Sequence, residues 1–547
     1  MQLVVNYLII FVNFRIGVLL YKELGEQRYM RASDLKNDYK YEKSKKRDFS
    51  LIRALYDMKE KEEYSLDDQS YNDLDMSSVY EKIDRTYSSA GESALYCMLR
   101  NIHVNSDLLT KRSKLIDLFR SDIDLMAKVH VHYYDLGYDN KNSLLDMIKD
   151  YLIINKKKFY IYTLLGKVLP LILSILTIVM ANPKFLIGLF GVVLINSYIN
   201  NKESKEIKDI GLVYLRRIIV AAKRVSKIDL EELKEYKIKI EKILNEIKII
   251  DKGTRVIGFG KAFAGIFEGI SVMFLLEEAA YYRISSEIEE KRDLILELYC
   301  ILGEIEALIS VARYQESLDG NISKPEFIKE IQLEIEEGIH PLVENAVPNS
   351  ININTKGIVL TGTNMSGKST FLRMLGINIV FAQSFNFVLA KKYKSCIFNI
   401  VSSISPNDDV NEGKSYYLAE AESILRIINA TKKEIPVFCP IDEIFRGTNP
   451  TERIAASAEI LKYINSKKTI SIVATHDREL ADILKENYEF FYFSESVDSK
   501  EGLSFDYKIK SGVSKTKNAI KLLEYIGYPK NIVNNAYKRS EDLEKFI

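Results

Sequence analysis

The chain has 547 residues, which is enough for about two to four domains and a large hydrophobic core. Charged residues make up 28% of it and apolar residues 47%, so the composition is that of a folded protein. The formal net charge of +1 excludes a surface that is basic all over, so any nucleic-acid contact has to come from a local patch. No Cys-x-x-Cys pair or histidine cluster occurs, which argues against zinc and favours buried thiols in a reducing compartment for Cys97, Cys300, Cys396 and Cys439.

The first 79 residues are expected to form an apolar segment followed by a charged linker. Residues 1–21 are nearly all apolar, but they lack the charged start and the small-residue cleavage site of a secretory signal. A membrane anchor and a short buried or interfacial helix both fit this segment, because Arg15 sits too centrally for a comfortable span. Residues 32–75 are polar and of mixed charge, which indicates a linker or a solvated helix.

Helical signals dominate residues 80–335, for which we expect a largely α-helical domain. Residues 228–250 repeat apolar side chains three and four positions apart, which predicts one long amphipathic helix. Segment 202–255 has more basic than acidic residues, but the two kinds are interleaved. This pattern favours a solvated helical arm over a nucleic-acid surface.

An apolar hairpin at residues 159–199 stands apart within this helical region. Residues 159–180 are apolar except for Lys167, and residues 185–199 are uncharged, with the turn signal Asn182-Pro183-Lys184 between them. Lysines at 156–158 and at 202 flank the two ends, which is typical of a membrane hairpin with both ends on the cytoplasmic side. The alternative is a helical hairpin buried in a large core, since each arm is a little short for the ~20 residues of a span.

A phosphate-binding loop is the strongest motif in the chain. It follows a short β-rich run, residues 357–361, and opens a helix, which is the strand–loop–helix context that this motif requires. Its glycines let backbone N–H groups close around phosphate oxygens, and the helix N-terminus adds a favourable dipole. We expect Lys368 to reach the β- and γ-phosphates of ATP and Ser369 to bind Mg²⁺. The predicted nucleotide-binding residues are Gly362, Thr363, Asn364, Met365, Ser366, Gly367, Lys368, Ser369 and Thr370.

Two acidic residues and a histidine follow later β-rich runs of what we expect to be an α/β domain with a mainly parallel sheet. Asp442 ends the run 437–441 and is expected to hold Mg²⁺, while Glu443 beside it orients or deprotonates the attacking water. His476 follows the run 469–473 and fits a γ-phosphate sensor. Pro440 lacks a backbone donor and predicts a local irregularity just before the acids. The predicted catalytic residues are Lys368, Glu443 and His476, and the predicted metal ligands are Ser369 and Asp442.

Together these motifs resemble the MutS family, within the ABC-type ATPase superclass. The resemblance rests on the loop at 361–373, the segment 408–415, the acidic strand end with its loop at 442–448, residues 474–476 and the closing segment 505–509, in the family's order. His340-Pro341 and Asn349 resemble the run into the domain. The resemblance covers about residues 335–540, and it extends more weakly to residues 85–91 and Arg112.

The resemblance implies a helical core and lever domain at 80–335, an ABC-type ATPase domain at 336–547 and a homodimer with two composite ATP sites. Ser415 by itself indicates only a helix N-cap, but the resemblance implies that it reaches the partner's γ-phosphate. It also implies that the ATP state is coupled through helical levers to a clamp around DNA. Residues 1–80 have no counterpart of the family's mismatch-reading domain, and Val347-Pro348 stand where many members place an aromatic residue against adenine.

Two functions stay open on these grounds. The first is a MutS-like ATPase that uses ATP and Mg²⁺ and couples dimer closure to DNA binding, without mismatch recognition. The second is an ATPase of the same family anchored in the membrane by residues 159–199, which acts on a membrane or protein partner without a DNA role. A transporter's ATPase subunit is disfavoured because the apolar segments are too few to form a pathway. In either case we expect a cytoplasmic ATPase domain, associated with the membrane if the hairpin inserts and soluble otherwise.

Overall fold

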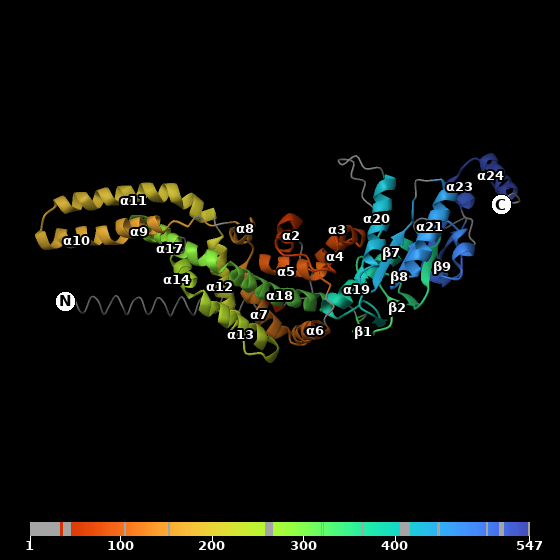
Figure 1. Cartoon of the computed structure of the whole chain (residues 1–547), viewed down its shortest axis with the longest axis horizontal. Coiled ribbons are helices and arrows are strands. Elements are labelled where there is room, and N and C mark those ends of the chain that lie inside the picture. Colours follow the sequence, from red (N-terminus) through yellow and green to blue (C-terminus); the bar gives the residue numbers. More distant parts are fainter. Residues whose placement is uncertain are drawn as a thin grey trace. The chain divides into compact units, whose positions relative to one another are not determined.

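The structure is a computed structural model of the chain, and it describes residues 33–36, 45–102, 106–150, 152, 154–209, 211–257, 266–318, 320, 322–363, 366–404, 416–445, 449–498, 502–513 and 519–544. The apolar segment expected at residues 1–21 lies outside these residues. The chain forms two compact units. Figure 1 shows the chain coloured from its N-terminus to its C-terminus. One unit comprises Met1–Lys61, Ile83–Cys97 and Lys114–Ser317, and the other comprises Glu62–Lys82, Met98–Ser113 and Leu318–Ile547. The second unit therefore holds two short early segments that the domain limits expected from the sequence do not assign to it.

The first unit is helical among its described residues. Its longest buried element is α18 (Arg292–Glu316), from which the fully buried Glu306 accepts a hydrogen bond from Tyr87 N at 2.5 Å and another from the Ser88 hydroxyl. These bonds satisfy donors at the start of α5, which a carboxylate at a helix N-terminus does well. Helices α5 (Ser89–Arg100) and α6 (Ser106–Ser121) contribute residues to both units. The other helices of this unit are α2 (Phe49–Met58), α7 (Ile123–Leu136), α8 (Ser143–Lys149), α9 (Lys156–Thr163), the π-helix η1 (Leu164–Val168), α10 (Leu169–Met180), α11 (Lys184–Asp209), α12 (Leu212–Val225), the 3₁₀ turn η2 (Glu231–Leu233), α13 (Lys234–Glu246), α14 (Lys248–Ile257), α16 (Ile266–Met273) and α17 (Leu276–Glu290).

The single long helix predicted at 228–250 is wrong, although its apolar stripe is correct. The segment consists of η2, α13 and α14, and the break between the two α-helices falls at Ile247, whose φ of −93° and ψ of 19° leave the helical range. Ile240, Ile243, Ile247 and Ile250 are all buried. The periodicity of the apolar residues identified the buried face. It did not reveal the break, because the end of one helix and the start of the next keep the same face buried.

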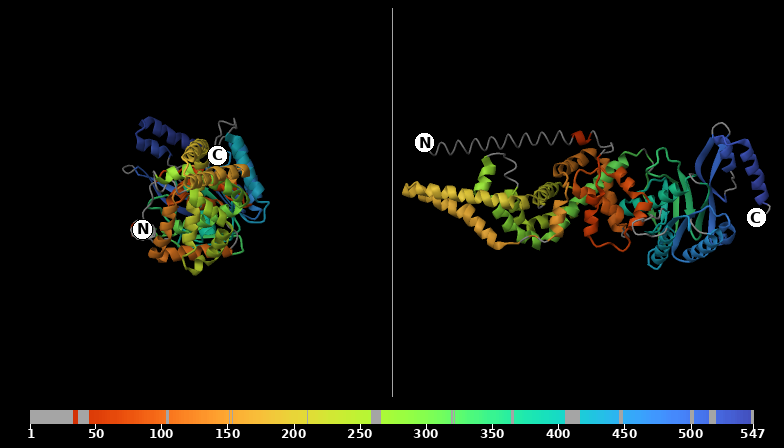
Figure 2. Two further views of the ribbon diagram at one scale, coloured as in Figure 1. Left: turned by 90° about the vertical axis from the view of Figure 1, so that its left-hand side faces the viewer. Right: turned by 90° about the horizontal axis from the view of Figure 1, so that it is seen from above.

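The predicted apolar hairpin is helical in both arms. The first arm consists of α9, η1 and α10, and the second is α11, and the two arms lie side by side in Figures 1 and 2. The turn falls at Ala181, with φ at 47°, and Asn182 Oδ1 accepts a hydrogen bond from Lys184 N at 3.0 Å. The alternative of a hairpin buried in a core disagrees with its exposure, because only 11% of the apolar stretch of either arm is buried.

A six-stranded sheet forms the centre of the second unit, in the strand order β10-β9-β4-β8-β7-β6. All neighbouring strands pair in parallel except β9 and β10, which are antiparallel. The strands are β4 (Gly357–Thr361), β6 (Asn399–Ile400), β7 (Val437–Asp442), β8 (Thr469–Ala474), β9 (Tyr488–Asp498) and β10 (Gly502–Ser511). The helices of this region are α19 (Lys368–Phe385), α20 (Tyr416–Ala430), α21 (Pro450–Asn465), α22 (Leu480–Leu484), α23 (Ala519–Ile526) and α24 (Lys530–Glu544).

The central strands are buried on both faces, as expected of parallel strands covered by helices. Val359, Val437, Cys439 and Val473 belong to one apolar cluster with residues of α20 and α21. Strand β7 runs through Pro440 without a register shift against β8, so the irregularity predicted before Asp442 lies elsewhere. On the β6 side the regular ladder stops after Ile400 and resumes only as an isolated bridge between Ser403 and Ile441. Proline has no N–H to donate there, which explains the short neighbouring strand.

A second, smaller sheet has the order β1-β5-β2-β3, and its strand β5 follows the P-loop helix in the chain. It consists of β1 (Glu326–Phe327), β2 (Leu333–Gly338), β3 (Asn349–Ile353) and β5 (Lys392–Ser395). Two early helices of the same unit, α3 (Asp68–Asp73) and α4 (Met76–Ile83), complete the set. Among the described residues, Cys97, Cys396 and Cys439 are buried and Cys300 is half-buried, and none of the four forms a disulfide.

Candidate nucleotide-binding site

The predicted phosphate-binding loop connects β4 directly to α19. Gly362 has a φ of 145° and Gly367 a φ of 105°, which are backbone conformations that side chains with a Cβ rarely adopt. A Cβ on Gly362 would also lie 2.9 Å from the carbonyl oxygen of Phe493 on β9, so the loop has no room for one. Asn364 and Met365 lie outside the described residues. The two glycines let the chain turn sharply from a buried strand into the first turn of a helix, which leaves its N–H groups available to an anion.

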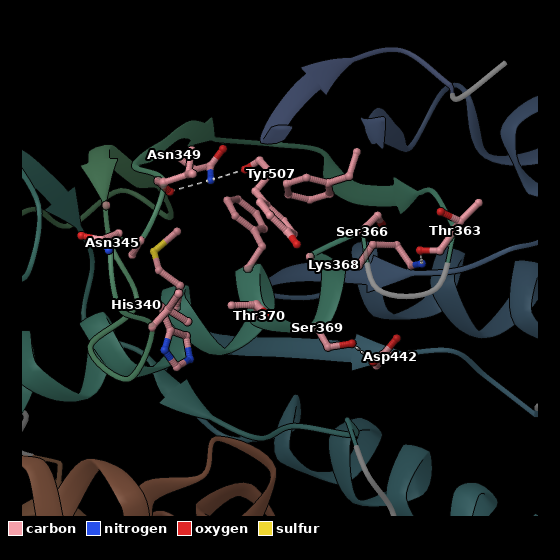
Figure 3. A pocket seen from close by; sticks show the side chains of 18 of the residues that line it. His340, Asn345, Asn349, Thr363, Ser366, Lys368, Ser369, Thr370, Asp442 and Tyr507 are labelled. Carbon is pink, nitrogen blue, oxygen red and sulfur yellow. Dashed lines mark hydrogen bonds between the residues drawn. The ribbon is translucent and has the colours of Figure 1, made fainter. Parts of the chain in front are cut away.

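Lys368 is held against the loop that precedes it. Its Nζ donates to the carbonyl oxygen of Gly362 at 2.7 Å and to that of Thr363 at 2.9 Å, and the residue is only 6% exposed. A buried ammonium costs free energy unless its donors are bonded, and the two carbonyls provide that compensation. The side chain is thereby fixed over the loop, where a phosphate bound to the loop would meet its charge (Figure 3).

Ser369 and Asp442 meet across the top of the sheet. The Ser369 hydroxyl donates to Asp442 Oδ2 at 2.5 Å, which joins the first turn of α19 to the end of β7. Parallel strands place their carboxyl ends on one edge, so a serine of the P-loop helix and an acid after a neighbouring strand come together there. A hydroxyl and a carboxylate are ligands that suit Mg²⁺, and this pair is therefore the candidate metal site.

Glu443 and His476 form a second pair beside the first. His476 Nε2 lies 3.1 Å from Glu443 Oε1, and Glu443 N donates to the carbonyl oxygen of Ala474 at 2.9 Å. Glu443 has a φ of 65°, a left-handed conformation that costs a residue with a Cβ about 1–2 kcal/mol. Partial burial and the nearby Lys368 ammonium lower the pKa of His476. The Glu443 carboxylate raises it, but by less. The strained turn after β7 thus aims the carboxylate at the histidine rather than along the strand.

The loop that carries His476 is fixed from both sides. Thr475 N donates to the carbonyl oxygen of Leu360 at 3.0 Å, which joins the loop to β4. Asp477 binds the Arg453 guanidinium of α21 through both carboxylate oxygens, one of them at 2.9 Å from Nε. A paired carboxylate–guanidinium contact fixes orientation as well as distance. His476 therefore sits between two anchored neighbours.

These pairs border one pocket of about 850 Å³, whose lining includes Thr363, Ser366, Gly367, Lys368, Ser369, Thr370, Asp442, Glu443 and His476. Every predicted site residue among the described ones therefore lies at this pocket or, for Gly362, at the start of its loop. Ser415 and segment 408–415 lie outside the described residues, as do residues 446–448. No three His, Cys, Asp or Glu side chains gather as a metal-binding group in the described ranges.

Tyr507 is a pocket residue that the sequence reasoning did not single out. It lines the pocket from β10, and a Cβ built on Gly367 would lie 3.3 Å from its Cδ1, so the ring reaches the phosphate loop (Figure 3). Asn349 holds this stretch of β10, because its Nδ2 donates to Tyr507 O and its Oδ1 accepts from Ile509 N, both at 2.9 Å. Val347 lines the same pocket without an aromatic ring. The aromatic alternation of Phe505 and Tyr507 was the available signal.

His340 lines the pocket on the side of the small sheet and is 8% exposed. Its Nδ1 accepts a hydrogen bond from Leu342 N at 3.2 Å, and its Nε2 is buried without a partner among the described residues. Burial and the Arg373 guanidinium lower its pKa to about 4. The ring is therefore neutral near pH 7, with the proton on Nε2.

The early helix α3 is bonded to the elements around this site. The buried Asp73 accepts hydrogen bonds from the Ser402 hydroxyl at 2.7 Å and from Ile404 N at 3.0 Å, and its own carbonyl oxygen accepts from Arg373 Nε at 2.8 Å. Arg373 lies on the P-loop helix α19, and residues 402–404 lead from β6 toward the predicted signature segment. From the sequence, residues 32–75 were expected to be a linker or a solvated helix, but α3 within this range is instead hydrogen-bonded into the second unit. A lone aspartate in a polar stretch offers no local signal for such a role.

Comparison with known proteins agrees with the geometry. Residues 358–544 match the family model of MutS domain V, which is a P-loop ATPase domain. Over 285 residues the chain is 31% identical to a protein from Clostridium botulinum (strain Okra / Type B1) named DNA mismatch repair protein MutS, in a match that covers 49% of this chain and 30% of that protein. Proteins of the same name from Thermotoga maritima and Aquifex pyrophilus are each 30% identical, over 273 and 279 residues.

These matches cover 48% and 49% of this chain, and 34% and 32% of the two proteins. The chain thus spans about a third of the length of the curated relatives it matches. The family-model match at residues 358–544 includes the phosphate loop, Asp442, Glu443 and His476. Residues 358–544 are therefore a domain V of the MutS family, the P-loop ATPase domain of its members.

Proposed function

We propose that this chain binds ATP with Mg²⁺ and hydrolyses it to ADP and phosphate. The observation that carries the proposal is the convergence of Lys368, the Ser369–Asp442 pair and the Glu443–His476 pair on one pocket behind a phosphate loop. These five residues come from three separate stretches of sequence, the phosphate loop, the end of β7 and the end of β8. A parallel sheet whose strand ends carry these groups beside an anion-binding helix N-terminus supports phosphoryl chemistry over simple nucleotide storage.

The residues divide the chemistry between them. The loop N–H groups and the Lys368 ammonium bind the phosphates and balance the charge that grows on them as the γ-phosphorus is attacked. Glu443 accepts the proton of the attacking water, and His476 Nε2 donates to the carboxylate and holds it in place beside the γ-phosphate. Water thereby adds to the γ-phosphorus while ADP leaves. Ser369 and Asp442 are the residues that would hold Mg²⁺, which would supply positive charge to offset that of the phosphates.

The nucleobase is proposed to lie on the Tyr507 side of the pocket. The Tyr507 ring is 45% exposed and stacks on Phe505 at 5.6 Å between centroids with planes 29° apart, so one face is supported and the ring still has accessible surface. A supported aromatic face suits stacking against adenine. This placement replaces the aromatic residue that the sequence lacks at Val347.

We further propose that the active form is a homodimer with sites shared between chains, in which Ser415 completes the partner's site. This part rests on the family resemblance and on the relatives, since Ser415 lies outside the described residues. In mixtures of Lys368→Ala and Ser415→Arg chains, a mixed dimer has one site with both lesions and one with neither. Recovery of turnover on mixing supports shared sites, whereas no recovery with mixed dimers present rejects them.

Coupling of dimer closure to DNA binding is the finer proposal, and it rests on the relatives, which are named as DNA mismatch repair proteins. The basic residues of segment 202–255 give it little support, because several are paired within the unit. Asp251 binds Arg216 at 2.7 Å, Lys223 at 2.6 Å and Arg255 at 2.5 Å. Mismatch recognition is not proposed, since the match to the relatives covers only about a third of their length.

DNA binding by the full-length protein tests this coupling. Fluorescence anisotropy with perfect duplex, mismatched and branched DNA, with and without ATP and at two salt concentrations, should show ATP-dependent affinity that falls as salt rises. Affinity that is absent for all three DNA structures in both nucleotide states would leave an ATPase without a DNA role.

The second candidate function is a membrane-anchored ATPase of the same family, acting on a membrane or protein partner. The specific observation in its favour is the exposure of the two hairpin arms, Lys156–Met180 and Lys184–Glu203, since only 11% of the apolar stretch of each is buried. Turnover by this candidate would not need DNA, and the ATPase site would face the cytosol, where the nucleotide is. Fractionation of the full-length protein before the DNA measurements separates the two candidates.

A further inference from the structure

The hairpin of α9, η1, α10 and α11 has an outer surface that is apolar on both arms. On the first arm the large exposed apolar side chains include Leu171, Ile175, Ile178 and Val179, whose exposed fractions run from 50% to 79%. On the second arm Ile187 is 73% exposed, and Leu186, Phe190, Leu194 and Ile195 are exposed as well. The arms pack on each other along their inner faces, and Leu173 lies 3.5 Å from a Cβ built on Gly188. Soluble proteins rarely expose a contiguous apolar surface of this extent without a partner for it.

We propose that this hairpin inserts into a lipid bilayer from one side and fixes the helical unit to it. The proposal deepens the second candidate function by naming the surface and its ligand, and it does not rest on ATP hydrolysis. A core helix is the alternative source of such an apolar stretch, and its residues would be mostly buried. Among the described residues, only 11% of the apolar stretch of either arm is buried. Because both arms expose apolar stripes, the matching partner has to surround the hairpin, which a bilayer does and a single protein groove does not.

The lengths of the arms match a bilayer. The first arm runs for 25 residues, Lys156–Met180, and the second for 20 residues, Lys184–Glu203. At about 1.5 Å of rise per residue they extend about 37 Å and 30 Å, against a hydrocarbon core of ~30 Å. Tyr160 and Tyr198 lie near the base of the two arms and are 68% and 72% exposed. Exposed tyrosines at the open end of both arms are typical of the membrane–water interface.

The charges complement anionic headgroups. No Asp or Glu occurs between Asp150 and Glu203, whereas six lysines do, at positions 156, 157, 158, 167, 184 and 202. Lys156, Lys157 and Lys202 are exposed at the base, and Lys184 is exposed at the tip. Lysines at these ends attract phosphate headgroups and keep their ammonium groups outside the hydrocarbon. Lys167 is also exposed, and it lies in η1 within reach of the base by snorkelling.

Two hydroxyls on the arms are bonded in a way that suits hydrocarbon. The Thr177 hydroxyl donates to the carbonyl oxygen of Leu173 at 2.8 Å, and the Ser197 hydroxyl donates to that of Val193 at 2.9 Å. Such bonds to the preceding helical turn remove the need for water. The buried Asn196 donates to the carbonyl oxygens of Leu165 at 3.1 Å and of Met273 at 2.7 Å, which joins both arms to the end of α16.

A polar cluster fixes the base of the hairpin to the rest of the unit. Glu203 accepts hydrogen bonds from Lys158 Nζ at 2.7 Å, Tyr162 at 3.0 Å and Tyr282 at 2.6 Å, and its side chain is 6% exposed. Tyr282 belongs to α17, so this carboxylate ties both arms to the body of the unit. An inserted hairpin would therefore orient the helical unit at the membrane and not merely tether it.

Flotation of the full-length protein with lipid vesicles tests the proposal. The wild type should float with vesicles of phosphatidylcholine and phosphatidylserine, and less with phosphatidylcholine alone. Leu171→Asp combined with Ile175→Asp should release it, since each central carboxylate weakens insertion on the order of a hundredfold. These positions face outward, so they test lipid contact, whereas Leu173 would also disturb the packing of the arms. Ile238→Asp is the matched control, because Ile238 is 60% exposed on α13, away from the hairpin, and should not alter flotation.

Three results would overturn the proposal. One is wild-type protein that stays soluble and monodisperse without detergent and does not float with either vesicle. Another is a failure of the variants to differ: the double variant Leu171→Asp with Ile175→Asp floats like the wild type, or Ile238→Asp reduces flotation as strongly as the double variant. The third is a soluble oligomer that the two aspartates dissociate, since a second copy would then cover the hairpin. ATP turnover measured on the same samples shows that each variant is folded. If no sample, including the wild type, hydrolysed ATP, that result would contradict the proposed ATPase site and not the hairpin.

Discussion

Replacing Glu443 by glutamine is the most informative change at the ATPase site. Glu443 Oε1 lies 3.1 Å from His476 Nε2, and the amide oxygen of a glutamine can accept the same hydrogen bond. Glutamine also has the size and the backbone tolerance of glutamate at the left-handed φ of 65°. The substitution therefore retains the geometry of the pair and removes the negative charge and the basicity.

The expected loss follows from the role of the carboxylate. Removal of a general base lowers the rate by about 10²–10⁴, equivalent to ~3–5 kcal/mol in the activation free energy. The affinity for ATP should change little, because the proposed phosphate contacts are the P-loop and Lys368, whose hydrogen bonds to the loop do not involve Glu443. The turnover number should fall by at least about a hundredfold at saturating ATP and Mg²⁺.

Phosphate release under saturating ATP, together with the affinity for a fluorescent ATP analogue, measures the two quantities separately. Glu479→Gln is the matched control, because Glu479 is exposed near the same edge of the sheet and should leave turnover unchanged. A Glu443→Gln protein that turns over within tenfold of the wild type refutes the assignment, and His476 would then be the next candidate base. A loss of affinity as large as the loss of turnover would instead mean that Glu443 acts in binding.

Three further predictions concern the same pocket. Lys368→Ala should lower ATP affinity by at least about tenfold and abolish most turnover, because alanine leaves the β- and γ-phosphates without the ammonium. Equilibrium binding measures the affinity and phosphate release measures the turnover, and near-normal hydrolysis would contradict the P-loop role. Tyr507→Ala should weaken ATP binding about fivefold to a hundredfold through lost stacking, while Tyr507→Phe retains it; equal affinities for the two variants would place the base elsewhere. The pKa of His340 falls from 6.5 to about 4 in the folded protein, so the unfolded chain binds more protons between these values. The contribution of His340 to the free energy of unfolding should be fully present above pH 6.5. It should fall by up to about 3 kcal/mol as the pH drops toward 4. His340→Asn should reduce this decline in urea titrations across the pH range, and an unchanged profile would reject it.

The sequence by itself determined the local chemistry of this protein. A P-loop specifies its own geometry, because the two glycines, the lysine and the helix that follows are adjacent in the chain. Strand β4 and helix α19 therefore fall where the pattern predicted. Asp442, Glu443 and His476 were also found from sequence, because buried parallel strands are short apolar runs and their carboxyl ends meet at one edge. The apolar arms of the hairpin were visible for the same local reason.

Only the tertiary structure decided which distant residues share the site and which surfaces are exposed. Tyr507 reaches the loop because antiparallel β10 returns beside β9 and shifts register after Phe505, and no local pattern encodes that shift. Asp73 bonds to Ser402, more than three hundred residues later, so its role depends on a contact that sequence spacing cannot reveal. The sequence located the two arms of the hairpin but not their surroundings, since composition cannot distinguish a buried arm from an exposed one. The distinction lies in what packs against each side chain, and that is a property of the folded chain alone.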